Sequence, residues 1–182
     1  DLLISQTERC SEILKKISKK QIKEDQFISS MKLENLLDEI IHSFQETSSK
    51  NISLISDNDK NKINTQRSPE IIYGLRNFID NAIKFSKSKV NVILKSDEKN
   101  IEIIITDDGP GFPEDIKTIL GEPYIRSKSK EVNLNAGLGL GIFLGKTLLE
   151  RQLANLFFSQ DKKLGGASVI ISWRVNNIKS NF

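Results

Sequence analysis

Cysteine and histidine are almost absent from this chain of 182 residues, which contains one of each, Cys10 and His42. A single cysteine excludes an internal disulfide framework and fits a reducing compartment. With only one histidine beside it, we do not expect a zinc site of the usual cysteine and histidine type.

Long hydrophobic runs and a strong charge of one sign are absent as well. The longest apolar runs hold about five residues, far fewer than the roughly 20 that cross a bilayer, and no signal peptide is recognisable. The net charge is +3, and no basic cluster is interleaved with aromatic residues, which argues against nucleic-acid binding. The composition, 37% hydrophobic and 28% charged, is typical of a globular domain. We therefore expect a cytoplasmic domain, and the sequence leaves membrane attachment of the parent protein open.

The first 24 residues predict one helix with a seam for a partner helix. Leu3, Cys10 and Ile17 recur every seven residues, and Gln6 and Ile13 occupy the intervening positions, which is a heptad pattern. Two interpretations stay open: packing against the rest of this chain, or the remnant of a helical bundle that dimerises. Because the chain begins without methionine and inside this helix, we expect a fragment of a longer protein.

Hydrophobic periodicity and turn residues predict the remaining elements. Helices are expected over 33–46, 68–87, 113–120 and from 137–141 to 151, and strands over 52–55, 89–96, 101–107, 156–159 and 167–175. Polar connections are expected over 21–30, 56–67 and 121–136. Helices mixed with antiparallel hairpins predict an α+β fold, a two-layer sandwich in which helices cover one face of a mixed β-sheet.

The helix over 68–87 carries an unusual polar stripe. Asn77, Asn81 and Lys84 fall within about one sixth of the helix circumference. A solvated face would explain such a stripe, but asparagine is a poor helix former that costs ~0.6 kcal/mol relative to alanine. Carboxamide oxygens suit Mg²⁺, which keeps several waters and bridges to phosphates. The stripe therefore indicates a metal and phosphate site.

Two glycine segments follow. Residues 105–112, Ile-Thr-Asp-Asp-Gly-Pro-Gly-Phe, are compatible with a plain β-turn, or with an acidic residue at a strand end where glycines let a planar ligand approach the backbone. Residues 137–143, Gly-Leu-Gly-Leu-Gly-Ile-Phe, open a helix, where free N–H groups and the helix dipole favour phosphate. The intervening stretch of about 25 residues has the character of a lid.

In this order and spacing, the three segments resemble the N, G1 and G2 boxes of the GHKL ATPase superfamily, and Gly-Leu-Gly-Leu-Gly-Ile looks like that of sensor histidine kinases. The resemblance covers about 31–175. It implies a Bergerat ATP-binding fold for 31–182, preceded by 1–26 as the second helix of a dimerisation and phosphoacceptor domain. A closer resemblance, to RegB-type redox-responsive kinases, is carried by 107–112, 120–124, 137–143, 146–151 and by Glu8-Arg9-Cys10.

The resemblance implies a role for each matching position. Asn81 is expected to bind Mg²⁺ with Asn77 as a second ligand, and Lys84 to contact phosphate, which makes Asn77 and Lys84 the candidates for catalysis. Asp107 is expected to read adenine, and Phe85 to line its pocket. The other positions implied to bind ATP are Gly109, Gly111, Tyr124, Arg126, Lys128, Gly137, Leu138, Gly139, Leu140 and Gly141. RegB-like chains usually carry Thr or Ser at the position of Arg126, which puts its role in doubt.

The residue at position 77 bears on the choice among activities. ATP-hydrolysing members of the superfamily place a glutamate there as the base that activates water, and a carboxamide cannot take that proton. A transferase needs no such base when the acceptor is a neutral imidazole. We therefore expect a histidine kinase core that serves a response regulator and is part of a homodimer when full-length. The alternatives are a GHKL ATPase, a serine kinase of the anti-sigma type, and a regulatory module that only binds ATP.

His42 and Cys10 complete the set of candidates. His42 belongs to the predicted ATP-binding domain, and no acidic residue or proline follows it within reach, so we expect an ordinary histidine and a phosphoacceptor outside this fragment. Cys10 is either a small packing residue or, at a seam position of a twofold dimer, a redox-sensitive thiol that meets its own copy. Arg9 beside it would favour the thiolate.

Overall fold

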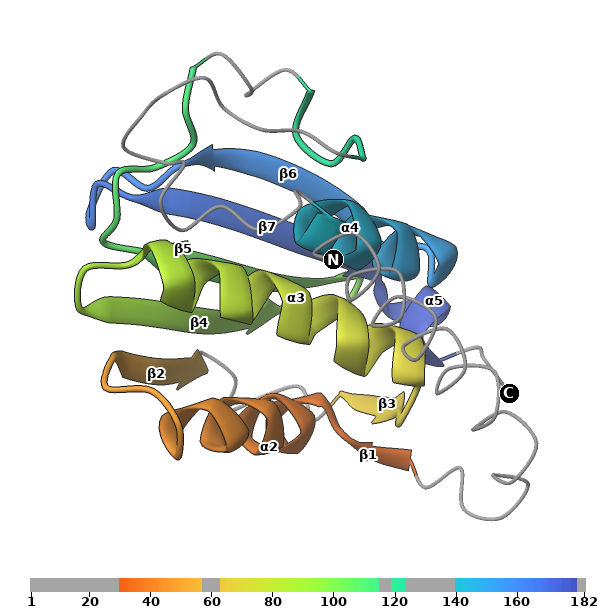
Figure 1. Cartoon of the computed structure of the whole chain (residues 1–182). Coiled ribbons are helices and arrows are strands. Elements are labelled where there is room, and N and C mark those ends of the chain that lie inside the picture. Colours follow the sequence, from red (N-terminus) through yellow and green to blue (C-terminus); the bar gives the residue numbers. More distant parts are fainter. Residues whose placement is uncertain (1–29, 57–62, 115–118, 124–139, 180–182) are drawn as a thin grey trace, which may run out of the picture. The chain divides into compact units, whose positions relative to one another are not determined.

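A mixed sheet of five strands forms the frame of the domain (Figure 1). The computed structural model describes residues 30–56, 63–114, 119–123 and 140–179. The strands follow the order β2-β4-β5-β7-β6, with bounds β2 Asn51–Ser56, β4 Lys89–Ser96, β5 Asn100–Asp107, β6 Asn155–Gln160 and β7 Ala167–Arg174. β2 runs parallel to β4, and the other neighbouring strands are antiparallel. A separate pair joins β1 (Ser30–Lys32) to β3 (Asn64–Gln66).

Helices cover one face of this sheet, where α3 and α4 lie side by side (Figure 1). Their bounds are α2 Leu33–Gln45, α3 Pro69–Phe85, α4 Leu140–Arg151 and α5 Val175–Lys179. The start of α3 follows from its sequence, because the Ser68 side chain accepts a hydrogen bond from the N–H of Ile71 at 3.4 Å and Pro69 stands in the first turn. Within the described ranges, every helix is too short or too polar to span a bilayer.

Strand alternation separates a buried face from an open one. Every second residue of β4 and β5 turns toward the helices and is buried, namely Val90, Val92, Leu94, Ile101, Ile103 and Ile105. These residues join the apolar sides of α2 and α3 and the buried Trp173 in one hydrophobic core. Removing this apolar surface from water is the main stabilising term for the layer arrangement.

The two-layer α+β expectation is confirmed, but three local expectations are wrong. β3 and the first residue of β1 lie in segments expected to be polar connections, and Val175 begins α5 instead of ending a strand. β3 reads as polar, yet Thr65 is buried and α5 packs against the strand, so tertiary contacts outweigh local propensity. The helices expected over 1–24 and 113–120 fall on residues that are wholly or partly outside the described ones.

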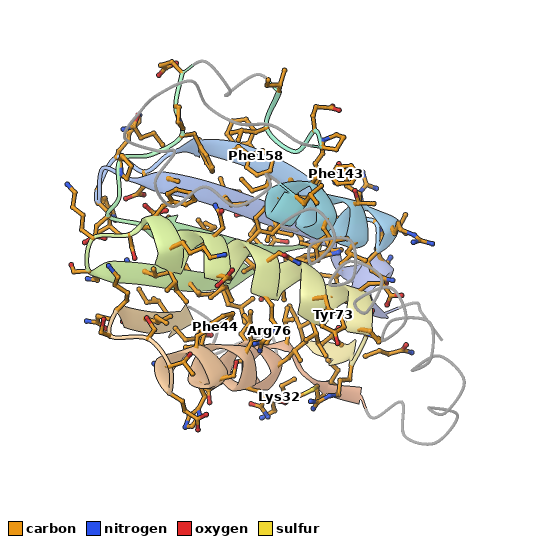
Figure 2. The ribbon with its side chains drawn as sticks, viewed as in Figure 1. Lys32, Phe44, Tyr73, Arg76, Phe143 and Phe158 are labelled. Atoms are coloured by element: carbon orange, nitrogen blue, oxygen red, sulfur yellow. The ribbon has the colours of Figure 1, made fainter. Side chains whose placement is uncertain are left out.

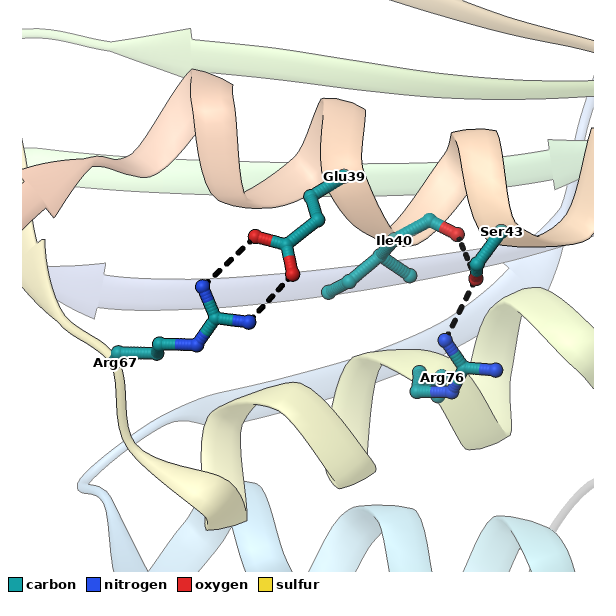
Figure 3. A network of polar contacts seen from close by, with 5 residues as sticks. All are labelled: Glu39, Ile40, Ser43, Arg67 and Arg76. Atoms are coloured by element: carbon teal, nitrogen blue, oxygen red, sulfur yellow. Dashed lines mark hydrogen bonds and ion pairs between the residues drawn. The ribbon is translucent and has the colours of Figure 1, made fainter. Parts of the chain in front are cut away.

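Polar contacts tie α2 to α3 along their shared seam. Arg67 and Glu39 form a two-pronged ion pair, with N···O distances of 2.9 and 2.5 Å (Figure 3). Arg76 donates to the hydroxyl of Ser43 at 2.7 Å (Figure 3), and its guanidinium lies 4.7 Å from the centre of the Phe44 ring (Figure 2). These contacts fix α3, the helix that carries the polar stripe, against α2.

Candidate functional site

The strand register collects segments that are distant in sequence at one end of the sheet. Asn51 of β2 is level with Lys89 of β4, and Val90 pairs with Asp107. Thr106 in turn pairs with Ser168. The end of α3, the glycine turn after β5 and the hairpin before β7 therefore meet here.

Asp107 is the buried acid of this cluster, with 3% of its surface exposed. Its Oδ1 atom accepts hydrogen bonds from the N–H of Gly109 at 2.8 Å and from the N–H of Ala167 at 3.2 Å. Burial raises the pKa of the Asp107 carboxyl, and the two backbone hydrogen bonds oppose that shift. The negative charges of Asp108 and Asp161 add to the rise. A carboxyl held in this way is oriented, partly dehydrated and ready to accept from a buried donor.

Three glycines shape the walls around Asp107. A Cβ atom on Gly109 would overlap the carbonyl oxygen of Phe85, and one on Gly166 would overlap the backbone and carboxylate oxygens of Asp107 itself. Gly111 has φ +79°, in the left-handed region that favours glycine. The expected shaping role of Gly109 and Gly111 thus has a steric basis. The sequence alone does not single out Gly166, because its closeness to Asp107 depends on the pairing of β5 with β7.

The polar stripe of α3 faces the start of α4. The Asn77 amide nitrogen donates to the carbonyl oxygen of Tyr73 on its own helix at 2.8 Å, which fixes the carboxamide. A Cβ atom on Gly141 would lie 3.7 Å from the Asn77 Oδ1 atom, so the first turn of α4 approaches that oxygen. Asn81 is half-buried one turn further on, and Lys84 forms an exposed ion pair with Asp80 at 2.9 Å.

Aromatic rings connect the glycine turn to α3. The ring of Phe112 meets that of Phe158 edge-on, with centroids 5.8 Å apart, and Phe158 lies 6.1 Å from Phe78. This chain of rings runs from the turn after β5 through β6 (Phe158, Figure 2) to α3. Phe85 at the end of α3 is half-buried, and its carbonyl faces Gly109.

Asp108 is a residue whose role the sequence did not reveal. Its Oδ1 atom accepts from the N–H groups of Lys87 at 2.8 Å, Ser88 at 3.0 Å and Lys89 at 3.1 Å, and its Oδ2 atom accepts from the Ser88 hydroxyl at 2.7 Å. Although desolvation works against ionisation, the hydrogen bonds from the Ser88 side chain and the three backbone groups hold the pKa of Asp108 far below its ordinary value. The carboxylate stays charged and binds the loop after α3.

Several expected positions lie outside the described residues. They are Tyr124, Arg126, Lys128, Gly137, Leu138, Gly139 and the N-terminal Cys10. Of the glycine segment 137–143, residues 140–143 are described, as the first four positions of α4. Among them, Gly141 lies beside Asn77.

His42 lies on α2, with 71% of its side chain exposed. Its Nδ1 atom is 3.6 Å from a carboxylate oxygen of Glu46, one helical turn further on. The expectation that no acidic residue follows within reach is therefore wrong, because the helix brings position i+4 beside the imidazole. The pair is a surface contact at the end of α2.

Known proteins resemble both the sequence and the fold. The sequence profile described as "Histidine kinase-, DNA gyrase B-, and HSP90-like ATPase" matches residues 67–177. The sensor histidine kinase RegB of Cereibacter sphaeroides is 42% identical over 98 residues, which are 51% of this chain and 21% of that protein. The sensor histidine kinase CpxA of Escherichia coli is 33% identical over 98 residues, 53% of this chain and 21% of that protein. The chain thus spans about a fifth of the length of these relatives.

Solved structures share the architecture at low identity. The mycobacterial sensor histidine kinase MprB superposes with a TM-score of 0.65 at 21% identity, over 80% of this chain and 97% of that one. Full-length ShkA in complex with AMPPNP gives 0.64 at 19% identity, over 81% of this chain and 31% of that one. The fold expected from the sequence is the fold of these kinase domains.

Proposed function

Because this chain belongs to the family of histidine kinase-, DNA gyrase B-, and HSP90-like ATPases, we propose that it is the ATP-binding catalytic core of a two-component sensor histidine kinase. It would transfer the γ-phosphate of ATP to a histidine outside the present chain, from which a response regulator takes it. The observation that carries the proposal is the buried Asp107, held between the glycine turn and β7. The 42% identity to RegB supports the kinase assignment within the family.

Adenine is the ligand that Asp107 suits best. Because Gly109 and Ala167 both donate to Oδ1, Oδ2 is the oxygen that would accept from the exocyclic amine. A hydrogen bond to a charged acceptor in a partly dehydrated site contributes about 1.5–3 kcal/mol. Gly109, Gly111 and Phe85 would form the walls against which the purine lies.

The phosphates and Mg²⁺ would lie between α3 and the start of α4. Among the described residues, no group of three or more histidines, cysteines or carboxylates could hold a metal. The candidate donor beside Gly141 is instead the carboxamide of Asn77, and that of Asn81 lies one turn further along α3. Carboxamides fit an ion held mainly by phosphate and water. Bound Mg²⁺ would neutralise phosphate charge there. Lys84 would exchange its exposed ion pair with Asp80 for a phosphate contact.

Asn77 favours transfer over hydrolysis. Its amide is anchored to the Tyr73 carbonyl, and a carboxamide cannot act as a general base near neutral pH. The acceptor must therefore be nucleophilic without help, as a neutral imidazole is. The alternative function, an ATPase or an ATP-binding regulatory module, would show phosphate release or binding without transfer.

The decisive experiment mixes the chain, Mg²⁺ and radiolabelled ATP with a separate helical-hairpin domain that carries an acceptor histidine. We expect acid-labile label on the hairpin, lost with Asp107→Asn in the chain or with the acceptor histidine changed to alanine. Phosphate release from ATP without any label on the hairpin would favour the ATPase alternative. Nucleotide binding without either product would favour the regulatory module.

Residues 1–26 and Cys10 extend the proposal to the full-length protein. We assign 1–26 to the second helix of the dimerisation domain, and Cys10, at a seam position, to a redox-sensitive contact between two copies. An oxidant should then yield a dimer on non-reducing gels that Cys10→Ser abolishes. A monomer band that oxidation leaves unchanged would remove the redox assignment and leave the kinase proposal intact.

A further inference from the structure

The loop that follows α3 is held from two sides. Asp108, at the end of β5, accepts from the N–H groups of Lys87, Ser88 and Lys89. Lys50, just before β2, donates from its ammonium to the carbonyl oxygens of Ser86 at 2.9 Å and Lys87 at 2.6 Å. The two charged side chains thus bind successive donors and acceptors of the same short loop.

Backbone contacts complete this arrangement. The N–H of Asn51 donates to the carbonyl of Ser88 at 2.8 Å, and the N–H of Asp108 donates to the carbonyl of Lys89 at 3.2 Å. The N–H of Ser86 closes the last turn of α3 by donating to Ala82 at 2.8 Å. The loop therefore cannot shift without carrying the end of α3 with it.

The end of α3 touches the adenine-reading turn directly. The carbonyl of Phe85 approaches Gly109 so closely that no Cβ fits between them, and the N–H of Gly109 orients Asp107. A displacement of the loop would move Phe85 against Gly109 and release Asp107 from its orientation. Neither Lys50 nor Asp108 has to touch the nucleotide for this effect.

We propose that Lys50 and Asp108 are positioning residues for nucleotide binding, which act by locking the loop 86–89 and, through Phe85 and Gly109, the orientation of Asp107. This inference rests on the proposed function, since it names residues that make the same site bind well. The inference gives the two aspartates different roles: Asp108 holds the backbone, and Asp107 faces the ligand.

The chain offers a matched control for a purely structural role. Asp97, in the turn between β4 and β5, also accepts backbone hydrogen bonds, from Lys99 and Asn100 at 2.7 Å each. The hydrogen bonds to Lys99 and Asn100 likewise lower its pKa. The register places this turn at the opposite end of the sheet from Asp107. For Lys50, the control is Lys95, an exposed lysine near the same far end of β4.

The experiment measures two quantities on each variant: the dissociation constant for Mg²⁺-ADP by titration calorimetry, well below the unfolding temperature, and the unfolding temperature itself. We expect Asp108→Asn and Lys50→Met to weaken nucleotide binding by about fivefold or more, the effect of losing one good hydrogen bond. Asp97→Asn and Lys95→Met should leave the dissociation constant within about twofold of the wild type, even where Asp97→Asn lowers the unfolding temperature.

Conservative variants keep the test decisive. Lys50→Arg, whose fork can serve both carbonyl oxygens, should restore binding to within about twofold. Ser88→Ala removes the hydroxyl contact alone and serves as the milder variant if Asp108→Asn does not fold. The inference would be overturned if Asp97→Asn and Asp108→Asn lost affinity equally, or if Asp108→Asn and Lys50→Met kept full affinity. The proposed function would stand in either case. A wild-type chain that binds no nucleotide would instead refute the proposed function, and the inference with it.

Discussion

Two neighbouring aspartates should respond in opposite ways to the same substitution. Asp107 is buried, and burial raises its pKa above the ordinary 3.8, so its ionised form costs stability at neutral pH. Asp108 has a lowered pKa, because the Ser88 side chain and three backbone N–H groups outweigh its desolvation. Its ionised form therefore stabilises the fold. We expect Asp107→Asn to raise the unfolding temperature of the nucleotide-free chain and Asp108→Asn to lower it.

The magnitudes follow from the contacts. Asparagine at 107 can keep both backbone hydrogen bonds through its oxygen while it removes a buried charge. Each kcal/mol gained in this way would raise the unfolding temperature by about 2–4 °C for a chain of this size. Asparagine at 108 loses the charge that strengthens the hydrogen bonds of Asp108, which costs about 1 kcal/mol and should lower the unfolding temperature by a similar amount.

Nucleotide affinity provides a second, independent test of the Asp107→Asn substitution. At position 107 the substitution replaces the acceptor proposed to bind adenine by a donor. Losing a charge-assisted hydrogen bond of about 1.5–3 kcal/mol weakens binding by about 10- to 150-fold. The Asp107→Asn variant should therefore unfold later than the wild type without nucleotide and gain much less from saturating Mg²⁺-ADP.

Scanning calorimetry between pH 2 and pH 8, with and without nucleotide, measures all of these effects. Because the folded pKa of Asp107 is raised, the stability that this group contributes is complete below its unfolded pKa and is lost as pH rises through the folded pKa. The stability advantage of Asp107→Asn over the wild type should grow as the pH rises from the unfolded to the folded pKa of Asp107 and then stay constant. The contribution of Asp108 is present above its unfolded pKa and is lost as pH falls toward the folded one. A nucleotide-free Asp107→Asn variant that unfolds earlier than the wild type at pH 7 would refute this reasoning.

Three further predictions test local features of the fold. Leu153 is 60% exposed and has φ +61° after the end of α4, so Leu153→Gly should stabilise the chain by about 1 kcal/mol in denaturant unfolding; a loss of stability would show that the leucine makes a contact worth more than its strain. A Cβ on Gly74 would lie 2.5 Å from Cγ of Leu149, so Gly74→Ala should lower the free energy of unfolding by about 1–3 kcal/mol. Leu149→Ala should cost less stability in the Gly74→Ala variant than in the wild type. His42→Ala should leave phosphotransfer to a separate hairpin domain unchanged, and acid-labile label on His42 itself would contradict our placement of the acceptor.

The sequence was most informative where the signal is local. Hydrophobic periodicity predicted a helix over 68–87, where α3 spans Pro69–Phe85, and strand alternation predicted β4 and β5 almost to the residue. The polar stripe of α3 was visible for the same reason, because asparagines at helical spacing oppose the local preference of the backbone. Each of these features depends on neighbours within a few positions.

The sequence was least informative where the feature depends on pairing between distant segments. β3 is a polar tripeptide whose strand conformation comes from β1 and α5. Gly166 looks like any hairpin glycine until the register of β5 and β7 brings it against Asp107. Lys50 is one of many lysines, and only the level starts of β2 and β4 bring it to the loop after α3.

Asp107 and Asp108 show how this distinction governs the site. Adjacent in sequence and alike in chemistry, they differ because the first is the last residue of β5, with its carboxyl turned into the hairpin of β7, while the second turns to the loop before β4. One end of the sheet thus holds both a carboxylate proposed to bind the ligand and a carboxylate that holds the surrounding backbone in place. Because Asp108 is saturated by protein donors, we expect a substitution there to affect the ligand only through geometry. Residues that never touch the nucleotide would then constrain the sequence of such a site as strongly as those that do.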